Sequence, residues 1–213
     1  MESTDRMTQA SRPQRVRKSP DERRREVAAA AREIALAEGL DGLTLRAVAA
    51  RIGVAPGLVA HYIPSMDDLV ADTFGDIVAG ELAGIVELIA GEPDAAGRIG
   101  MLVDTVLDGG RRDVTLVWVQ GWALGARNDA LAARVRIEMD AWQQAIADEI
   151  VRGQQAGAFG HEDADAVAWH LLAMFDGLGA QGLVRWRDDP DRTALTRRVL
   201  AGLLDVDPAV LER

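Results

Sequence analysis

The sequence predicts an all-α protein with an N-terminal three-helix domain that contains a helix-turn-helix, followed by a larger C-terminal helical bundle. Beyond Pro20 the chain is rich in Ala, Leu, Arg and Glu, which favour helices. Apolar residues recur every three or four positions, and the alternation typical of strands is almost absent. About nine helices are therefore expected.

Gly, Pro, Asn and Asp divide the chain into these helices. Asp21 is expected to cap the first helix, which begins after Pro20, and Thr44 to cap the second. Three glycines lie where a positive φ would end a helix: Gly39, Gly53 and Gly157. The predicted helices are 21–38, 45–52, 56–63, 66–90, 94–108, 112–126, 129–156, 163–186 and 191–204.

Composition narrows the class of protein. The 213 residues are 48% hydrophobic and 27% charged, which is ordinary for a folded domain. The absence of cysteine excludes disulfides, thiolate catalysis and cysteine-ligated zinc, and no cofactor or metal site is expected. Neither a signal peptide nor an apolar stretch of membrane-spanning length is found, so we expect a cytoplasmic protein with no membrane contact.

Charge is distributed unevenly along the chain. Residues 1–65 carry 11 basic and 8 acidic side chains, a net charge of +3, whereas residues 66–213 carry 13 and 26, a net charge of −13. A basic segment attached to an acidic body is typical of a nucleic-acid-binding module joined to another domain, although acidic proteins also vary along their length. Residues 1–19 have no apolar periodicity and are expected to form a flexible basic arm.

The most informative segment is 44–69, TLRAVAARIGVAPGLVAHYIPSMDDL. A short first helix has one apolar stripe, Leu45, Val48, Ala49 and Ile52. Gly53 permits a tight turn, Pro56 suits the first turn of a second helix, and Val59 gives that helix an inward face. This spacing indicates a helix-turn-helix in which two helices cross closely, and the alternative is a tight αα corner buried in a bundle.

Residues 22–70 resemble the tetracycline-repressor (TetR) family, through an amphipathic first helix, the EGLDGLTL element and the RAVAARIGVAPGLVAHYIPSMDDL segment. The resemblance implies that the helix beginning at Pro56 lies in the major groove of operator DNA. It implies eight DNA-contacting residues, four of them near base edges (Ala55, Pro56, Gly57 and Leu58) and four facing phosphates or flanking bases (Thr44, Arg46, His61 and Tyr62). Without the resemblance, His61 reads as a solvated side chain and Tyr62 as a core aromatic.

Two positions depart from the pattern of that family. Ala60 stands where many members have a Tyr, and Met66 where many have a Lys, so we expect two of the family's contacts to the DNA backbone to be missing. The helix tip APGLVA also offers few hydrogen-bond donors for the bases. We therefore expect Arg46, contacts with thymine methyl groups, the basic arm and DNA shape to contribute more than usual.

Residues 66–213 resemble, more loosely, the C-terminal domain of the betaine-pathway repressor branch of the family, through the LVWVQGWALGARNDALAARVRIEMDAW and AWHLLAMFDGLGAQGLVRW segments. The resemblance implies a homodimer in which the last two long helices of each chain pair. Six residues are expected in this interface: Gly177, Gly179, Leu183, Leu195, Val199 and Leu203. The string from Gly177 to Gly182 also matches a dinucleotide-binding GxGxxG pattern, but it lies inside a predicted helix without a preceding strand.

The C-terminal body contains an unusual set of large side chains. Trp118 and Trp122 lie four residues apart on one helix face, and the chain has five Trp but only one Tyr. Core packing is the plain interpretation of each residue alone, whereas together they indicate a pocket for an apolar or cationic small molecule of unknown identity. The predicted pocket residues are Met101, Asp104, Trp118, Trp122, Met139, Trp142, Phe175 and Asp176.

These observations predict a ligand-responsive transcriptional regulator, a repressor that a small molecule releases from a palindromic double-stranded operator. The expected domains are the arm at 1–19, a DNA-binding domain at 20–65, and a ligand-binding and dimerisation domain at 66–213. One alternative is a helical dimeric adaptor that does not bind DNA. The other is an enzyme, which the sequence disfavours because it has only three histidines and no HExxH, GxSxG or P-loop motif.

Overall fold

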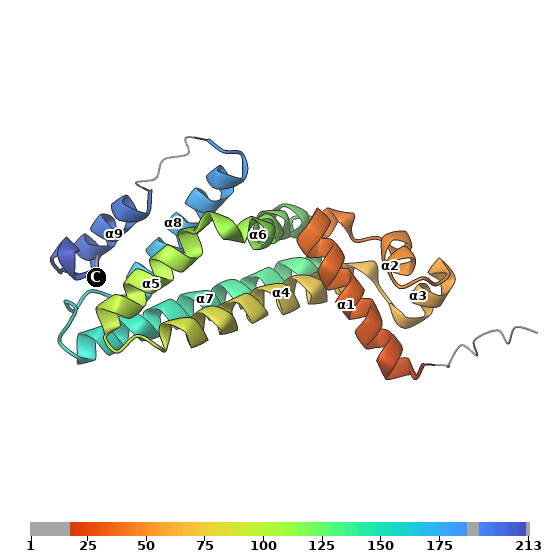
Figure 1. The fold of residues 1–213 in the computed structure, drawn as a ribbon, viewed down its shortest axis with the longest axis horizontal. Coiled ribbons are helices and arrows are strands. Elements are labelled where there is room, and N and C mark those ends of the chain that lie inside the picture. Colours follow the sequence, from red (N-terminus) through yellow and green to blue (C-terminus); the bar gives the residue numbers. More distant parts are fainter. Residues whose placement is uncertain (1–17, 187–191, 212–213) are drawn as a thin grey trace, which may run out of the picture.

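A computed structural model describes residues 18–186 and 192–211. Within these residues the chain forms nine α-helices and three short 3₁₀ turns, with no strand (Figure 1). The helices are α1 (Pro20–Glu38), α2 (Leu45–Arg51), α3 (Pro56–Tyr62), α4 (Met66–Ile89), α5 (Ala95–Leu107), α6 (Arg112–Gly125), α7 (Asp129–Gln155), α8 (Ala164–Leu183) and α9 (Arg192–Leu203). The 3₁₀ turns are η1 (Leu40–Gly42), η2 (Gly109–Arg111) and η3 (Pro208–Val210). The predicted all-α class is therefore confirmed.

The helix boundaries confirm most of the local predictions. Thr44 caps α2, because its hydroxyl accepts the Ala47 N–H at 3.0 Å. Gly39, Gly53 and Gly157 all have positive φ, at 87°, 67° and 71°. The eighth helix ends at Leu183, three residues before the predicted end, and the chain leaves it through a left-handed Arg185.

The predicted cap of the first helix was wrong. Ser19, rather than Asp21, caps α1: its hydroxyl accepts the Glu22 N–H at 3.2 Å, and its own N–H donates to the Glu22 carboxylate at 2.6 Å. This reciprocal pair satisfies two N–H groups at the helix start. Asp21 lies two residues after the cap, in the first turn of α1, where its carboxylate accepts from Arg24 instead.

Helices α1, α2 and α3 pack around one small core. Ile34 of α1, Val48 of α2 and Val59 of α3 are each 1% exposed or less. Neither α2 nor α3 exceeds seven residues, so each depends on this shared core for stability. The sequence predicts that α2 and α3 cross closely. As a result of this packing, α3 lies at one end of the molecule, beyond α1 (Figure 1).

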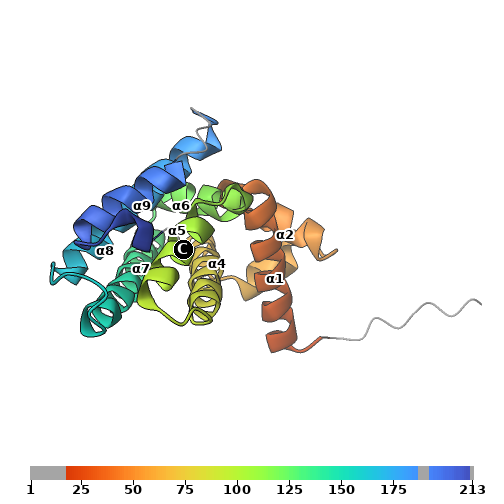
Figure 2. The same ribbon diagram turned by 60° about the vertical axis from the view of Figure 1, so that its left-hand side comes forward.

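Two long helices connect that end to the rest of the molecule. Helix α4 leaves the three-helix unit and runs along α7 for much of its length (Figures 1 and 2). The two approach closely at Gly75, where a Cβ atom would collide with the Arg134 guanidinium. Arg134 forms an ion pair with the buried Glu138 carboxylate at 2.7 Å. The positive charge of Arg134 at this crossing is therefore balanced by the negative charge of Glu138.

The other body helices cover α7 and the upper side of α4. Helices α5, α6 and α8 pack on α7, and α9 packs on α5 and α8 (Figure 2). Helix α9 lies at the end of the molecule away from α3 (Figure 1). Arg112 of α6 ties two of these helices together, because its guanidinium donates to the Gly182 and Leu183 carbonyls at the end of α8, each at 2.9 Å. No helix in the described residues is long and apolar enough to cross a bilayer.

Candidate functional sites

The first candidate site is the exposed surface of α2 and α3. Ala55, Pro56, Gly57 and Leu58 are all exposed at the start of α3, and Leu58 retains 38% of its accessible surface. An exposed leucine of this kind contributes little to its own domain's core. It is therefore available to contact apolar groups on a partner.

Two arginines of α2 differ in their partners. Arg46 is exposed near the start of the helix and has no ion pair or hydrogen bond within the described residues. Arg51, at the other end, bonds to Glu33 of α1 at 2.9 Å. The Arg46 guanidinium keeps all of its donors for an external acceptor such as a phosphate. Thr44 lies just before Arg46 and is also exposed.

The last predicted residues of this surface are His61 and Tyr62 at the end of α3. Their rings meet edge to face with centroids 5.1 Å apart. His61 is exposed and Tyr62 is half-buried, so the tyrosine combines packing with a polar tip near the surface. The predicted basic arm, residues 1–19, falls almost entirely outside the described residues.

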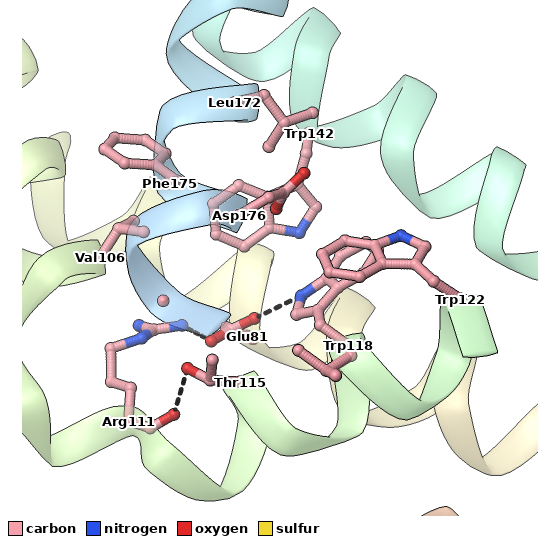
Figure 3. Close-up of a pocket in the computed structure, with 12 residues that line it drawn as sticks. Glu81, Val106, Arg111, Thr115, Trp118, Trp122, Trp142, Leu172, Phe175 and Asp176 are labelled. Carbon is pink, nitrogen blue, oxygen red and sulfur yellow. Dashed lines mark hydrogen bonds and ion pairs between the residues drawn. The ribbon is translucent and has the colours of Figure 1, made fainter. Parts of the chain in front are cut away.

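The second candidate site is a cavity of about 50 Å³ in the body (Figure 3). Side chains from α4, α5, α6, α7 and α8, together with η2, form its walls. The lining residues are Glu81, Val106, Arg111, Thr115, Trp118, Val119, Trp122, Trp142, Leu172, Phe175, Asp176 and Gly179.

Three indole rings form the aromatic wall of this cavity. Trp118 and Trp122 lie one turn apart on α6, with ring centroids at 5.7 Å, and Phe74 of α4 supports Trp118 edge to face at 5.2 Å. Trp142 enters from α7 and is only 3% exposed. Its buried Nε1–H has no hydrogen-bond partner within the described residues. A buried donor without an acceptor is costly, so a ligand that supplies an acceptor would relieve the cost.

The polar groups of the cavity differ in how they are satisfied. Glu81 of α4 forms an ion pair with Arg111 and accepts from Trp118 Nε1 at 3.4 Å (Figure 3). Asp176 of α8 has no hydrogen bond or ion pair within the described residues. Burial raises the pKa of Asp176 to about 6. At neutral pH the cavity therefore contains one carboxylate without a counter-ion, beside aromatic rings.

The structure brings five of the eight predicted pocket residues to this cavity: Trp118, Trp122, Trp142, Phe175 and Asp176. The other three do not line it. Asp104 is exposed and forms an ion pair with Arg197 of α9, while Met101 and Met139 pack against the core elsewhere. Sequence reasoning did not find Glu81, Arg111 or Thr115. A lone Glu on α4 and an Arg beside two glycines give no local signal, because their positions depend on how distant helices pack.

The predicted interface residues lie on α8 and α9 with unequal exposure. Leu195 and Val199 are 55% and 40% exposed, and Gly177 is also exposed. Leu183 and Leu203 are half-buried. Gly179 instead faces inward, since a Cβ atom there would lie 3.2 Å from the Thr115 methyl group. Sequence reasoning missed three exposed apolar side chains next to this face: Trp169, Val184 and Trp186.

Comparison with known families covers both parts of the chain. The bacterial regulatory proteins of the tetR family match residues 27–73, and the C-terminal domain of BetI-type transcriptional repressors matches residues 95–205, more than half of the chain. The chain belongs to the TetR family of transcriptional regulators. It is thus a ligand-responsive DNA-binding regulator with a BetI-type C-terminal domain. Both resemblances inferred from the sequence are confirmed.

Solved structures of transcriptional regulators share the fold. A transcriptional regulator from Saccharomonospora viridis, in complex with choline, is 27% identical, with 87% of this chain and 96% of that chain covered and a TM-score of 0.73. A TetR transcription regulator from Haloarcula marismortui is 20% identical, with 87% and 97% covered and a TM-score of 0.71. The regulator FadR from Bacillus subtilis, in complex with stearoyl-CoA, is 17% identical, with 84% and 97% covered and a TM-score of 0.65. A search of curated proteins gave no match.

Proposed function

We propose that this TetR-family regulator is a homodimeric, non-catalytic repressor that a small organic cation releases from a palindromic operator. Residues 20–65 bind the DNA, and residues 66–213 bind the effector and dimerise. The single observation that carries the choice of effector is the unpaired Asp176 carboxylate in a cavity with three indole walls.

A cation satisfies this cavity better than a neutral or anionic ligand. The face of an indole ring attracts a positive charge, by up to about 2 kcal/mol where the charge is desolvated. The Asp176 carboxylate adds a counter-ion that no residue of the described chain neutralises. Trp118, Trp122 and Trp142 provide the rings, so an alkylated ammonium group can contact aromatic faces and a carboxylate together.

The same cavity favours a second polar group on the ligand. The buried Trp142 Nε1–H lacks an acceptor, and a hydroxyl or carboxylate oxygen next to the ammonium group would supply one. The cavity volume of about 50 Å³ favours a small effector. Choline combines an alkylated ammonium group with a hydroxyl group. The choline complex of the S. viridis regulator, at 27% identity, supports choline as the first compound to test.

Dimerisation through α8 and α9 is supported by an apolar face that the monomer leaves open. Trp169, Val184, Leu195 and Val199 are between 40% and 76% exposed, which is unusual for such large apolar side chains in one region. A two-fold pairing of these helices would bury them and would set the separation of two α3 helices, as a palindromic operator requires.

The effector proposal is tested by gel shifts on the DNA upstream of the protein's own gene. Choline and its uncharged isostere 3,3-dimethylbutan-1-ol are compared at equal concentrations, because they differ only in the charged atom. We expect choline to weaken operator binding at least tenfold and the isostere to have no effect. Equal effects of the two compounds, or none from choline, would reject a cationic effector, and salt-independent binding would favour the adaptor alternative.

The dimer is tested by sedimentation of a double variant, Leu195→Asp with Val199→Asp. Charges in the proposed interface should convert a dimer into a monomer and abolish the operator shift. The matched control is Val86→Asp, which places a charge on an equally exposed valine of α4. A wild-type monomer, or a double variant that remains dimeric, would contradict the proposed interface.

A further inference from the structure

Helix α6 presents different residues to the two functional parts of the protein. Trp118 and Trp122 line the effector cavity, and Gln120 lies between them in the sequence. Successive residues of an α-helix are rotated by about 100°, so a residue two positions from each tryptophan points away from the cavity side. Gln120 does not line the cavity.

Gln120 is hydrogen-bonded to the three-helix unit through both ends of its amide. Its Oε1 accepts the Leu40 N–H at 2.5 Å, and its Nε2 donates to the Asp41 carboxylate at 2.6 Å. Both partners belong to η1, the turn between α1 and α2, and lie about 80 residues away in sequence. Leu40 itself is 1% exposed, so the bonded backbone belongs to the core of that unit.

The surroundings leave the Gln120 amide little freedom. Gly39 has a φ of +87°, and a Cβ atom at this position would overlap the amide group of Gln120. The next residue, Gly121, meets α4 just as closely, because a Cβ atom there would lie 2.6 Å from the ring of Phe74. Helix α6 is therefore fitted against both η1 and α4. A close-packed contact of this kind transmits a displacement instead of absorbing it.

We propose that Gln120 couples effector binding to DNA binding. This inference rests on the proposed function and assigns its regulation to one side chain. When the effector enters between the indoles, α6 shifts, and the two Gln120 hydrogen bonds carry η1 with it. Because η1 leads directly through Thr44 into α2, its displacement reorients the helix-turn-helix and changes the separation of the two recognition helices.

The proposal predicts that replacing Gln120 reduces the effect of choline on operator binding but leaves the binding of each partner alone almost unchanged. Gln120 touches neither the cavity nor the exposed surface of α2 and α3, so Gln120→Ala should change the affinities for operator alone and for choline alone by less than about threefold. The ratio of operator dissociation constants with and without choline should fall from at least tenfold in the wild type to near one. Linkage requires the same change in the ratio of choline dissociation constants with and without operator, which provides an internal check.

The experiment measures both ratios by fluorescence anisotropy and calorimetry for four proteins. Gln144→Ala is the matched control, because within the described residues this glutamine of α7 bonds only to its own helix, to Asp148 at 2.8 Å. Asp41→Asn retains an oxygen that can accept from Nε2 and should keep most of the coupling. Full coupling in Gln120→Ala, or an equal loss in Gln144→Ala, would overturn the proposal.

A second measurement needs no effector, so it tests the role of Gln120 separately from the proposal that choline is the effector. Operator binding should change amide hydrogen exchange of the α6 residues 112–125 in the wild type, and Gln120→Ala should remove that change. If choline fails to release wild-type protein, the effector proposal fails, while this exchange result still tests Gln120. An operator-induced change of equal size in the variant would contradict the coupling role.

Discussion

The two functional regions of this regulator are built in different ways. The proposed DNA-contacting surface comes from one short stretch of α2 and α3. Its side chains Arg46 and Leu58 are exposed, and Arg46 has no ion pair or hydrogen bond within the described residues. The proposed effector cavity draws on five helices, and much of its wall is also part of the core of the body. This difference means that residues can be removed from the first region at little cost in stability, whereas residues of the second contribute to folding as well as to binding.

The largest expected effect is on stability, from Trp142→Ala. Trp142 is 3% exposed, and removing a buried tryptophan side chain lowers the free energy of unfolding by about 3–5 kcal/mol. Chemical denaturation of the variant and the wild type measures this difference. A loss below about 1 kcal/mol would show that the cavity walls are not part of the core, and the contrast between the two regions would fail.

The second prediction concerns Asp176 and pH. Because its folded pKa of about 6 exceeds that of the unfolded chain, the native state retains a proton between about pH 4 and 6 that the unfolded state has lost. The carboxylate therefore destabilises the free protein increasingly as the pH rises through this range, and fully above pH 6. Asp176→Asn should remove the penalty, so the variant should gain about 2 kcal/mol relative to the wild type between pH 4 and pH 8, allowing for partial exposure.

Choline binding provides the complementary measurement for the same residue. The wild type should bind choline about tenfold more weakly at pH 5 than at pH 8, because most Asp176 side chains are protonated one unit below their pKa. The affinity of Asp176→Asn should be lower at pH 8 and nearly independent of pH. A wild-type affinity that is flat across this range would exclude Asp176 as the counter-ion.

The local part of the fold was predictable because its signals lie close together in the sequence. The stripe from Leu45 to Ile52, the turn at Gly53 and the start at Pro56 each depend on neighbouring residues only, and the structure reproduces all three. The cap of α1 shows the limit of this reasoning. Ser19 and Asp21 are both good capping residues, and the choice between them depends on the position at which the chain enters the helix.

Only part of the proposed effector cavity could be predicted from the sequence, because some of its residues are close in sequence and others are not. Trp118 and Trp122 are neighbours on one helix face, so their spacing already placed them together. The Glu81 and Arg111 pair, and the contact of Gln120 with Leu40, join residues that are far apart in sequence. No periodicity encodes such contacts, since they depend on how α4, α6 and η1 pack in three dimensions.

The third prediction addresses the DNA-contacting surface. Arg46→Ala should weaken operator binding about tenfold or more, reduce the dependence of binding on salt by about one phosphate contact, and leave the free energy of unfolding within about 0.5 kcal/mol of the wild type. The control is Arg51→Ala on the same helix, whose guanidinium is already bonded to Glu33. Unchanged operator affinity for Arg46→Ala, measured by gel shift across several salt concentrations, would remove Arg46 from the interface.

The smallest expected effect is the most specific one, at Leu58. Its exposed side chain is expected to contact a thymine methyl group, so Leu58→Ala should weaken operator binding only about threefold, close to the value of one buried CH₂ group. Replacing the contacted thymine by deoxyuridine removes the methyl group from the DNA and should produce a similar loss with wild-type protein. If the two groups touch, the combined loss will be smaller than the product of the separate losses, whereas independent losses would show that Leu58 lies away from the bases. The stability of Leu58→Ala should remain unchanged, because a leucine that is 38% exposed adds little to the domain core.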